Sequence, residues 1–200
     1  FRDYLACPYR YYLRRVLGLK TIDDVAEELS GLDFGNLLHD VLKEIGTSEM
    51  NSSDDEVAVY QFLDERLLEL ANLRLGSARL PAVHLQIEQL RRRLQAFSHA
   101  QAESVALGWE THFVEVPADN AGGELDLGDG RKLRLNGRID RIDYHPDTGR
   151  WRILDYKTEA RGRAPDEVHR QKGAWIDLQL PLYRHMARPL GVTGQVELAY

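Results

Sequence analysis

The sequence predicts an α/β domain whose first half is helical and whose second half carries the strands. Apolar residues recur at helical spacing up to Gly108 and alternate with polar residues after it. Clusters of Gly, Pro and Asp separate the alternating segments, as turns do. The 200 residues are 43% hydrophobic and 29% charged, which is typical of a folded globular domain and excludes disordered, collagen-like and coiled-coil chains.

Four helices are predicted in the first half. The first is framed by Pro8, which suits a first helical turn, and by Gly18, which stops the helix. The third follows the capping cluster at residues 53–55, and the fourth begins at Pro81. The last two have the pattern of a helical hairpin inserted at about residues 52–107. The first two expected helices span residues 9–17 and 31–46.

The second half is predicted to form strands around one late helix. Residues 146–149, Pro-Asp-Thr-Gly, are strong turn formers, and residues 161–172 form a basic loop. The alternation of apolar and polar residues predicts the strands on either side of these segments. The expected strands span residues 109–116, 133–140, 151–157 and 196–200, and the expected helix spans residues 177–187.

The net charge and the hydropathy of the sequence limit which partners the protein can bind and where in the cell it is expected. There are 26 Lys and Arg against 32 Asp and Glu, a net charge of −6, which argues against a general nucleic-acid coat and leaves room for a local basic cleft. No segment approaches the roughly 18 apolar residues of a membrane span, and no signal peptide opens the chain. We therefore expect a cytoplasmic protein with no membrane partner. Because the sequence stops at Tyr200 inside an apolar run, we also expect a fragment of a longer chain.

The predicted hairpin between residues 140 and 155 carries the chemistry. If residues 146–149 form a four-residue loop, His145 pairs with Arg150, and counting back places Asp140 opposite Asp155. Directly opposed like charges are destabilising. Lys157 lies on the same face as Asp155 and supplies one positive charge. The remaining negative charge is what a hard divalent cation with oxygen ligands requires.

Simpler interpretations of these residues exist. An isolated Asp-x-Lys tripeptide is more often a cross-strand salt bridge, and a bulge would move Asp140 to the other face. A single histidine on an apolar helix, such as His39, is usually a core residue. Glu110 and Glu115 lie on a predicted strand nearby, and we expect both to face solvent.

Four short motifs in a fixed order resemble the PD-(D/E)XK nuclease superfamily, and most closely the RecB and AddB nuclease domains of bacterial helicase-nuclease complexes. They are His39, Gly137-Arg138-Ile139-Asp140, Asp155-Tyr156-Lys157 and Gln179-x-x-x-Tyr183. The resemblance implies a restriction-endonuclease-like core, a central mixed sheet flanked by helices, in one nuclease domain over residues 1–200. One departure is Ile139, which stands where the broader superfamily has proline.

The resemblance also implies a role for each motif residue. Asp140, Asp155 and Lys157 would be catalytic, and the metal would be Mg²⁺ or Mn²⁺. Gln179 and Tyr183 would brace the site or contact the DNA backbone. The implied metal ligands are His39, Asp140, Asp155 and the backbone carbonyl of Tyr156.

The implied substrate is DNA, single-stranded ends above all, delivered by a helicase domain or subunit during recombination or repair. Basic groups on the first helix and on the loop after Lys157 are the expected phosphate contacts. By contrast, Arg91, Arg92 and Arg93 are expected to be surface residues. The expected DNA-binding residues are Arg10, Arg14, Arg161, Arg163, Arg170 and Lys172.

Cys7 is the single cysteine and cannot form an internal disulfide. In AddB-like proteins a Cys-Pro pair upstream of the histidine motif joins three later cysteines to bind a [4Fe-4S] cluster. Cys7-Pro8 matches the first element, so the resemblance raises a cluster hypothesis for the full-length protein. The alternative is a small core residue.

Two other functions are compatible with the sequence. The first is a catalytically inactive DNA-binding or scaffolding module of the same fold, which the intact Asp140, Asp155 and Lys157 set disfavours. The second is a metal hydrolase with another substrate, which the basic loop disfavours only weakly.

Overall fold

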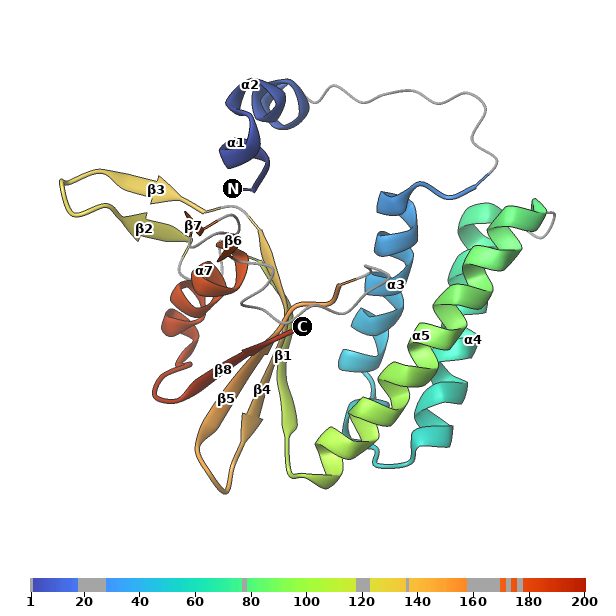
Figure 1. Cartoon of the computed structure of the whole chain (residues 1–200). Helices are drawn as coiled ribbons and strands as arrows, with labels where there is room; N and C mark the ends of the chain where they lie inside the picture. The colour runs from blue at the N-terminus through green and yellow to red at the C-terminus, as the bar shows by residue number, and fades with distance from the viewer. Residues whose placement is uncertain are drawn as a thin grey trace.

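The computed structural model describes residues 2–17, 28–76, 79–117, 123–135, 137–157, 170–171, 174–175 and 178–200. For residues 2–3, 14, 170–171 and 174–175 it describes the backbone alone. Within these ranges the chain has two parts, a group of long helices and a mixed β-sheet, which lie side by side (Figure 1).

The central sheet has four strands in the order β1-β4-β5-β8. The strands β1 (Glu110–Pro117), β4 (Arg138–His145) and β5 (Arg150–Leu154) form two antiparallel pairs, β1 with β4 and β4 with β5. Strand β8 (Val196–Ala199) pairs with β5 in parallel, after the crossover helix α7 (Gln179–Met186). The sheet is therefore mixed and flanked by helices, as the sequence predicts.

Three long helices form the helical part, and their ends follow the sequence signals. They are α3 (Gly31–Gly46), α4 (Glu56–Leu75) and α5 (Pro81–Ala106). Ser30 caps α3 by accepting a hydrogen bond from the Asp33 amide, and Asp55 caps α4 in the same way through the Val57 and Ala58 amides. The capping cluster and the start at Pro81 are confirmed.

Each of the two parts has its own cluster of buried apolar side chains. The first lies between α3, α4 and α5 and includes Val41, Leu63 and Leu90, all 0% exposed. The second lies between the sheet and α7 and includes Ile142 and Ile153. The Tyr156 ring packs against the first cluster from the segment that follows β5, so it links the sheet to the helices.

Gly46 at the end of α3 sets the distance between this helix and the sheet. A Cβ atom at this position would lie 2.6 Å from Cγ2 of Val114 on β1. Since only glycine allows so close an approach, the residue brings α3 against the strand that carries Glu115.

Short elements complete the described chain. The structure has α1 (Arg2–Ala6), α2 (Pro8–Tyr11), the π-helical turn η1 (Tyr12–Val16), η2 (Glu49–Ser52) and η3 (Arg188–Leu190). Two small two-stranded sheets pair β2 (Glu124–Asp126) with β3 (Lys132–Arg134), and β6 (Arg170–Gln171) with β7 (Ala174–Trp175).

Several expected boundaries are wrong. The strand expected at 133–140 is two strands, β3 and β4, because the same alternation runs through both and does not show the break. The strand expected at 151–157 is shorter, because β5 ends at Leu154. The Asp155 amide still donates to the Ala199 carbonyl at 3.1 Å, and the Tyr156 amide donates to Asp140. The helix expected at 9–17 is divided between α2 and the π-helical turn η1, and α7 is shorter than expected. The basic loop, residues 161–172, lies outside the described residues except for its last strand.

None of the described helices is long and apolar enough to span a membrane.

Candidate active site

Three carboxylates line up across three neighbouring segments of the sheet. The pairs Val114 with Arg141 and Val116 with Ile139 place Glu115 opposite Asp140. The pairs that run from His145 with Arg150 to Arg141 with Leu154 place Asp140 in line with Asp155. The predicted register of the hairpin is confirmed, and the structure adds Glu115. We call Glu115, Asp140 and Asp155 the carboxylate row.

The expectation that Glu115 faces solvent is wrong. Its side chain is 7% exposed, and its Oε2 forms an ion pair with Arg138 Nε. Burial raises the pKa of the Glu115 carboxyl, and the nearby Arg138 opposes that rise. The backbone φ of Glu115 is 55°, a left-handed value that is rare for a side-chain-bearing residue and that clusters at functional sites. Glu110, by contrast, is exposed as expected.

His39 lies on α3 against the middle of the row. Its Nε2 is 3.1 Å from the Tyr156 carbonyl oxygen, and its Nδ1 is 3.6 Å from Asp140 Oδ1. A carbonyl oxygen only accepts hydrogen bonds, so we assign the proton to Nε2. This leaves the lone pair on Nδ1 facing the carboxylate. His39, Glu115 and Asp140 each offer a ligand atom, and these atoms lie within 4.8 Å of one another.

Asp140 is buried in the centre of the row. Its Oδ2 accepts a hydrogen bond of 2.7 Å from the Tyr156 amide. Burial, and then repulsion from Asp155, raises the pKa of Asp140 from 3.8 to about 6. At neutral pH the apo protein therefore holds this negative charge at a free-energy cost.

Asp155 is 2% exposed and is held by Lys157 and Gln179. Lys157 Nζ is 2.5 Å from Asp155 Oδ2. Gln179 on α7 bridges the two, because its Oε1 accepts from Lys157 Nζ at 2.6 Å and its Nε2 donates to Asp155 Oδ1 at 2.7 Å. The Gln179 amide also contacts the Tyr183 hydroxyl at 2.8 Å. Burial and the charge of Asp155 raise the pKa of Tyr183.

A buried ionic network supports the tripeptide from the side of the sheet opposite Asp155. Arg141 donates from Nε to Asp143 at 2.5 Å and from Nη1 to Gln101 on α5 at 2.5 Å. Arg141 also hydrogen-bonds the Tyr156 side chain, whose pKa is raised by burial. Because Tyr156 lies between Asp155 and Lys157, this network fixes the segment that presents both groups.

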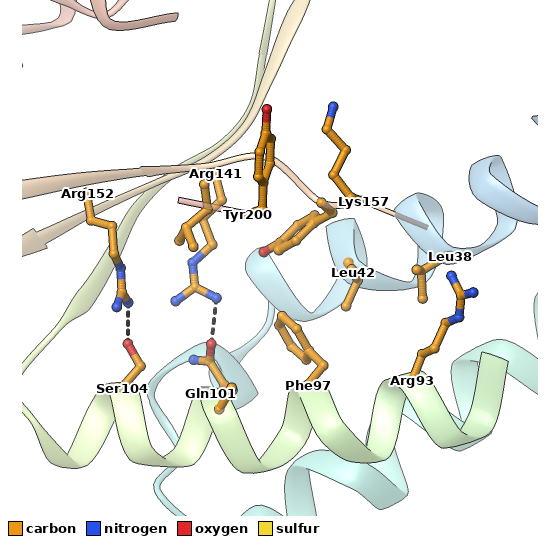
Figure 2. A pocket seen from close by; sticks show the side chains of 13 residues that line it. Leu38, Leu42, Arg93, Phe97, Gln101, Ser104, Arg141, Arg152, Lys157 and Tyr200 are labelled. Atoms are coloured by element: carbon orange, nitrogen blue, oxygen red, sulfur yellow. Dashed lines mark hydrogen bonds between the residues drawn. The ribbon is translucent and has the colours of Figure 1, made fainter. Parts of the chain in front are cut away.

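A hollow of about 410 Å³ adjoins this network. Figure 2 shows side chains that line it, with Arg141 hydrogen-bonded to Gln101 and Arg152 to Ser104 on α5. The expectation that Arg91, Arg92 and Arg93 are surface residues holds, although Arg91 and Arg93 are only partly exposed. Arg93 lines the hollow and stacks over the Phe34 ring at 5.0 Å. Arg91 forms a fork with both oxygens of Asp64. Arg92 is exposed as expected.

The other predicted site residues lie on different elements or outside the described part of the chain. Arg10 is exposed on α2, and Cys7, half-buried, precedes that helix. The backbone of Arg14 lies in η1 and that of Arg170 in β6, but their side chains are outside the described part of the chain. Arg161, Arg163 and Lys172 lie outside the described residues, so their role in DNA binding stays a prediction.

The donor set fits a hard divalent cation. Glu115 Oε2 and Asp155 Oδ2 are buried oxygens. Each forms an ion pair with a basic side chain, Arg138 or Lys157, but accepts no hydrogen bond from the described residues. The ligand atoms of His39, Glu115 and Asp140 lie within 4.8 Å of one another, whereas Asp155 is not part of this cluster. Carboxylate oxygens and imidazole nitrogen are ligand types that Mg²⁺ and Mn²⁺ take. The Tyr156 carbonyl faces His39 in this structure, and its role as a ligand stays a prediction.

Asp140→Asn is expected to stabilise the metal-free protein at pH 8. Because the folded pKa of Asp140 is about 6 against 3.8 in its ordinary state, stability falls as pH rises from 3.8 to 6 and stays lowered above. Removing the charge should raise the free energy of unfolding by about 1–3 kcal/mol at pH 8 and by almost nothing at pH 4. Denaturant unfolding in EDTA at both pH values measures this difference. A variant less stable than wild type at pH 8 would contradict the account of Asp140.

A mixed sheet that brings several carboxylates, a lysine and a histidine together is typical of hydrolases that cut phosphodiester bonds. The family model of the PD-(D/E)XK nuclease superfamily matches residues 1–200. The chain therefore belongs to this superfamily, as its motifs indicate.

Several curated proteins are similar to this chain. An ATP-dependent helicase/deoxyribonuclease subunit from Clostridium acetobutylicum is 28% identical over 90% of the chain and 16% of its own length. The corresponding subunit from Moorella thermoacetica is 31% identical over 92% of the chain and 17% of its length. An uncharacterized protein of Rickettsia conorii is 32% identical over 76% of the chain. The chain thus spans about a sixth of the length of the first two relatives.

Proposed function

We propose that residues 1–200 form a single nuclease domain that hydrolyses DNA with Mg²⁺ or Mn²⁺ bound at the carboxylate row. The observation that carries the proposal is the row itself. Three carboxylates opposed across strands repel one another. Among the described residues, Arg138 pairs with Glu115 and Lys157 pairs with Asp155, and neither arginine nor lysine pairs with Asp140. A DNA-binding scaffold has no need of negative charge facing a phosphate. The helical segment at about 52–107 is then an insertion into the nuclease core.

Each residue of the site has a distinct part in this reaction. A bound divalent cation neutralises charge on the phosphoryl group and lowers the pKa of water. His39 offers Nδ1 because the Tyr156 carbonyl holds its other nitrogen. Lys157 donates hydrogen bonds to the phosphoryl oxygens or to the attacking water, and Gln179 keeps its ammonium beside Asp155.

The proposed setting follows the named relatives. Because the similar proteins are subunits of helicase/deoxyribonucleases, we infer that the domain acts on DNA, single-stranded ends above all, beside a helicase domain or subunit in cytoplasmic recombination or repair. A [4Fe-4S] cluster takes four thiolates, and the sequence has one cysteine, so Cys7 could serve only with three thiolates from outside these 200 residues. No step of the reaction depends on it.

Labelled DNA tests the proposal. Single-stranded and duplex substrates are incubated with the protein in Mg²⁺, in Mn²⁺ and in EDTA, and the products are resolved on a gel. We expect cleavage in either metal and none in EDTA, with single strands cut faster. DNA that is bound but intact in every condition would instead support the inactive scaffolding module.

A further inference from the structure

Arg138 takes the position of a counter-charge for Glu115. The residue opens β4, and its Nε forms an ion pair with Glu115 Oε2. The two partners differ in exposure, because the Arg138 side chain is 53% exposed and that of Glu115 is 7% exposed. The arginine is therefore the partner that can turn outward, whereas the glutamate is fixed in the row.

A hollow of about 370 Å³ lies where Arg138 would turn. It is lined by Asn36, His39, Asp40, Arg74, Arg138 and Asp140, so it adjoins the row and carries a second arginine. Arg74, at the end of α4, pairs with Asp40 at 2.7 Å, and both side chains are about 40% exposed. Two guanidinium groups on one hollow match a phosphate group, which guanidinium binds through paired N–H donors.

Glu115 cannot serve a divalent cation and Arg138 equally well. A cation within reach of His39, Glu115 and Asp140 would place two positive charges beside a carboxylate that already holds a guanidinium. The divalent cation and the Arg138 guanidinium would repel each other strongly if both stayed in contact with the Glu115 carboxylate. Of the two, Arg138 moves away from Glu115 at the lower free-energy cost, because it is exposed. Water and a phosphate can then bind its guanidinium in place of Glu115.

We propose that the hollow is a binding subsite for a DNA phosphate next to the cleaved bond, and that metal binding makes Arg138 available to it by taking Glu115. Arg74 serves the same subsite without this control, because its partner Asp40 is outside the row. The proposal rests on the proposed function, since it needs both a metal and DNA. It assigns roles to two arginines and couples the two binding steps.

The first test is metal affinity without DNA. Titration of Arg138→Ala with Mn²⁺ in a calorimeter should show binding about three- to tenfold tighter than wild type, because the metal no longer displaces a guanidinium. Arg66→Ala, which removes an arginine paired with Glu69 on α4, should bind Mn²⁺ as wild type does. If wild type binds no Mn²⁺, the proposed function fails as well. If wild type binds and Arg138→Ala binds more weakly, only the exchange fails.

The second test is the salt dependence of DNA binding, measured by anisotropy of labelled single-stranded DNA. The background is Lys157→Ala, so that the DNA stays intact, and a gel checks that it does. Each lost phosphate contact lowers the slope of log K against log salt by about 0.7 for a single strand. We expect Arg138→Ala to lower the slope in Mn²⁺ and not in EDTA, and Arg74→Ala to lower it in both.

Each other pattern contradicts a part of the proposal. A lower slope for Arg138→Ala in both conditions would make Arg138 a plain phosphate contact and overturn the exchange. An unchanged slope in both conditions would remove Arg138 from the subsite. An unchanged slope for Arg74→Ala would show that the hollow holds no phosphate.

Discussion

Lys157→Ala is expected to abolish DNA cleavage and to leave DNA affinity within about twofold of wild type. Lys157 has its ammonium 2.5 Å from Asp155 and is positioned by Gln179, so it is fixed beside the row before any substrate binds. A preorganised donor aimed at charge that develops in the transition state contributes roughly 10²- to 10³-fold to the rate. One phosphate contact among many contributes little to affinity.

Rates from single-turnover gels and affinities in EDTA separate the two effects. The matched control is Lys132→Ala, which removes another lysine that is ion-paired with a carboxylate, Glu124, on the β2–β3 hairpin. The control should cut at the wild-type rate. Lys157→Ala protein that cuts at the wild-type rate would rule out its catalytic role.

Asp143→Ala is expected to lower the free energy of unfolding by about 3–5 kcal/mol, because breaking a buried ion pair leaves uncompensated charge. The Asp143 side chain is 0% exposed and pairs with Arg141 at 2.5 Å and with Arg152 at 2.8 Å. Its loss leaves two guanidinium groups beside α5 without their carboxylate. Arg141 also holds Tyr156, so the loss should disturb the catalytic segment.

Denaturant unfolding measures this effect. The control is Asp129→Ala, which removes an exposed partner of Arg131 and should change stability by less than about 1 kcal/mol. A loss below about 1 kcal/mol for Asp143→Ala would show that the network contributes little to the fold.

The sequence predicts those parts of the site whose residues lie close together along the chain. Asp140 and Asp155 flank one short turn, so the count along the hairpin fixes their register without knowledge of the rest of the sheet. Gln179 and Tyr183 lie four residues apart, which places both on one face of a helix. The structure puts that face beside Asp155, as the resemblance implies.

The remaining features depend on contacts between distant segments. Glu115 is separated from Asp140 by the β2–β3 hairpin, and β1 has a register irregularity between Thr111 and Phe113, so no count along the chain reaches it. Its alternating neighbours have the same pattern as those of a solvent-facing residue. Arg93 reaches the Phe34 ring only when α5 packs beside α3, and Arg141 reaches Gln101 only when α5 packs beside the sheet.

The same difference between local signals and contacts of distant segments explains which parts of the fold could be predicted. The starts of α3, α4 and α5 follow caps and Pro81, which are local signals. The break between β3 and β4 is not local, because β3 pairs with β2 whereas β4 joins the central sheet, and both segments alternate in the same way.

Titration of the wild-type protein and of Asp155→Ala with Mn²⁺ in a calorimeter tests most directly whether the carboxylate row is a metal site. Removing Asp155 deletes one buried carboxylate and leaves the pair of Glu115 and Asp140 with a weaker negative field. We expect measurable binding in wild type that is lost in Asp155→Ala, while Asp129→Ala, an exposed control, binds as wild type does. Equal Mn²⁺ affinity in wild type and Asp155→Ala would contradict the assignment.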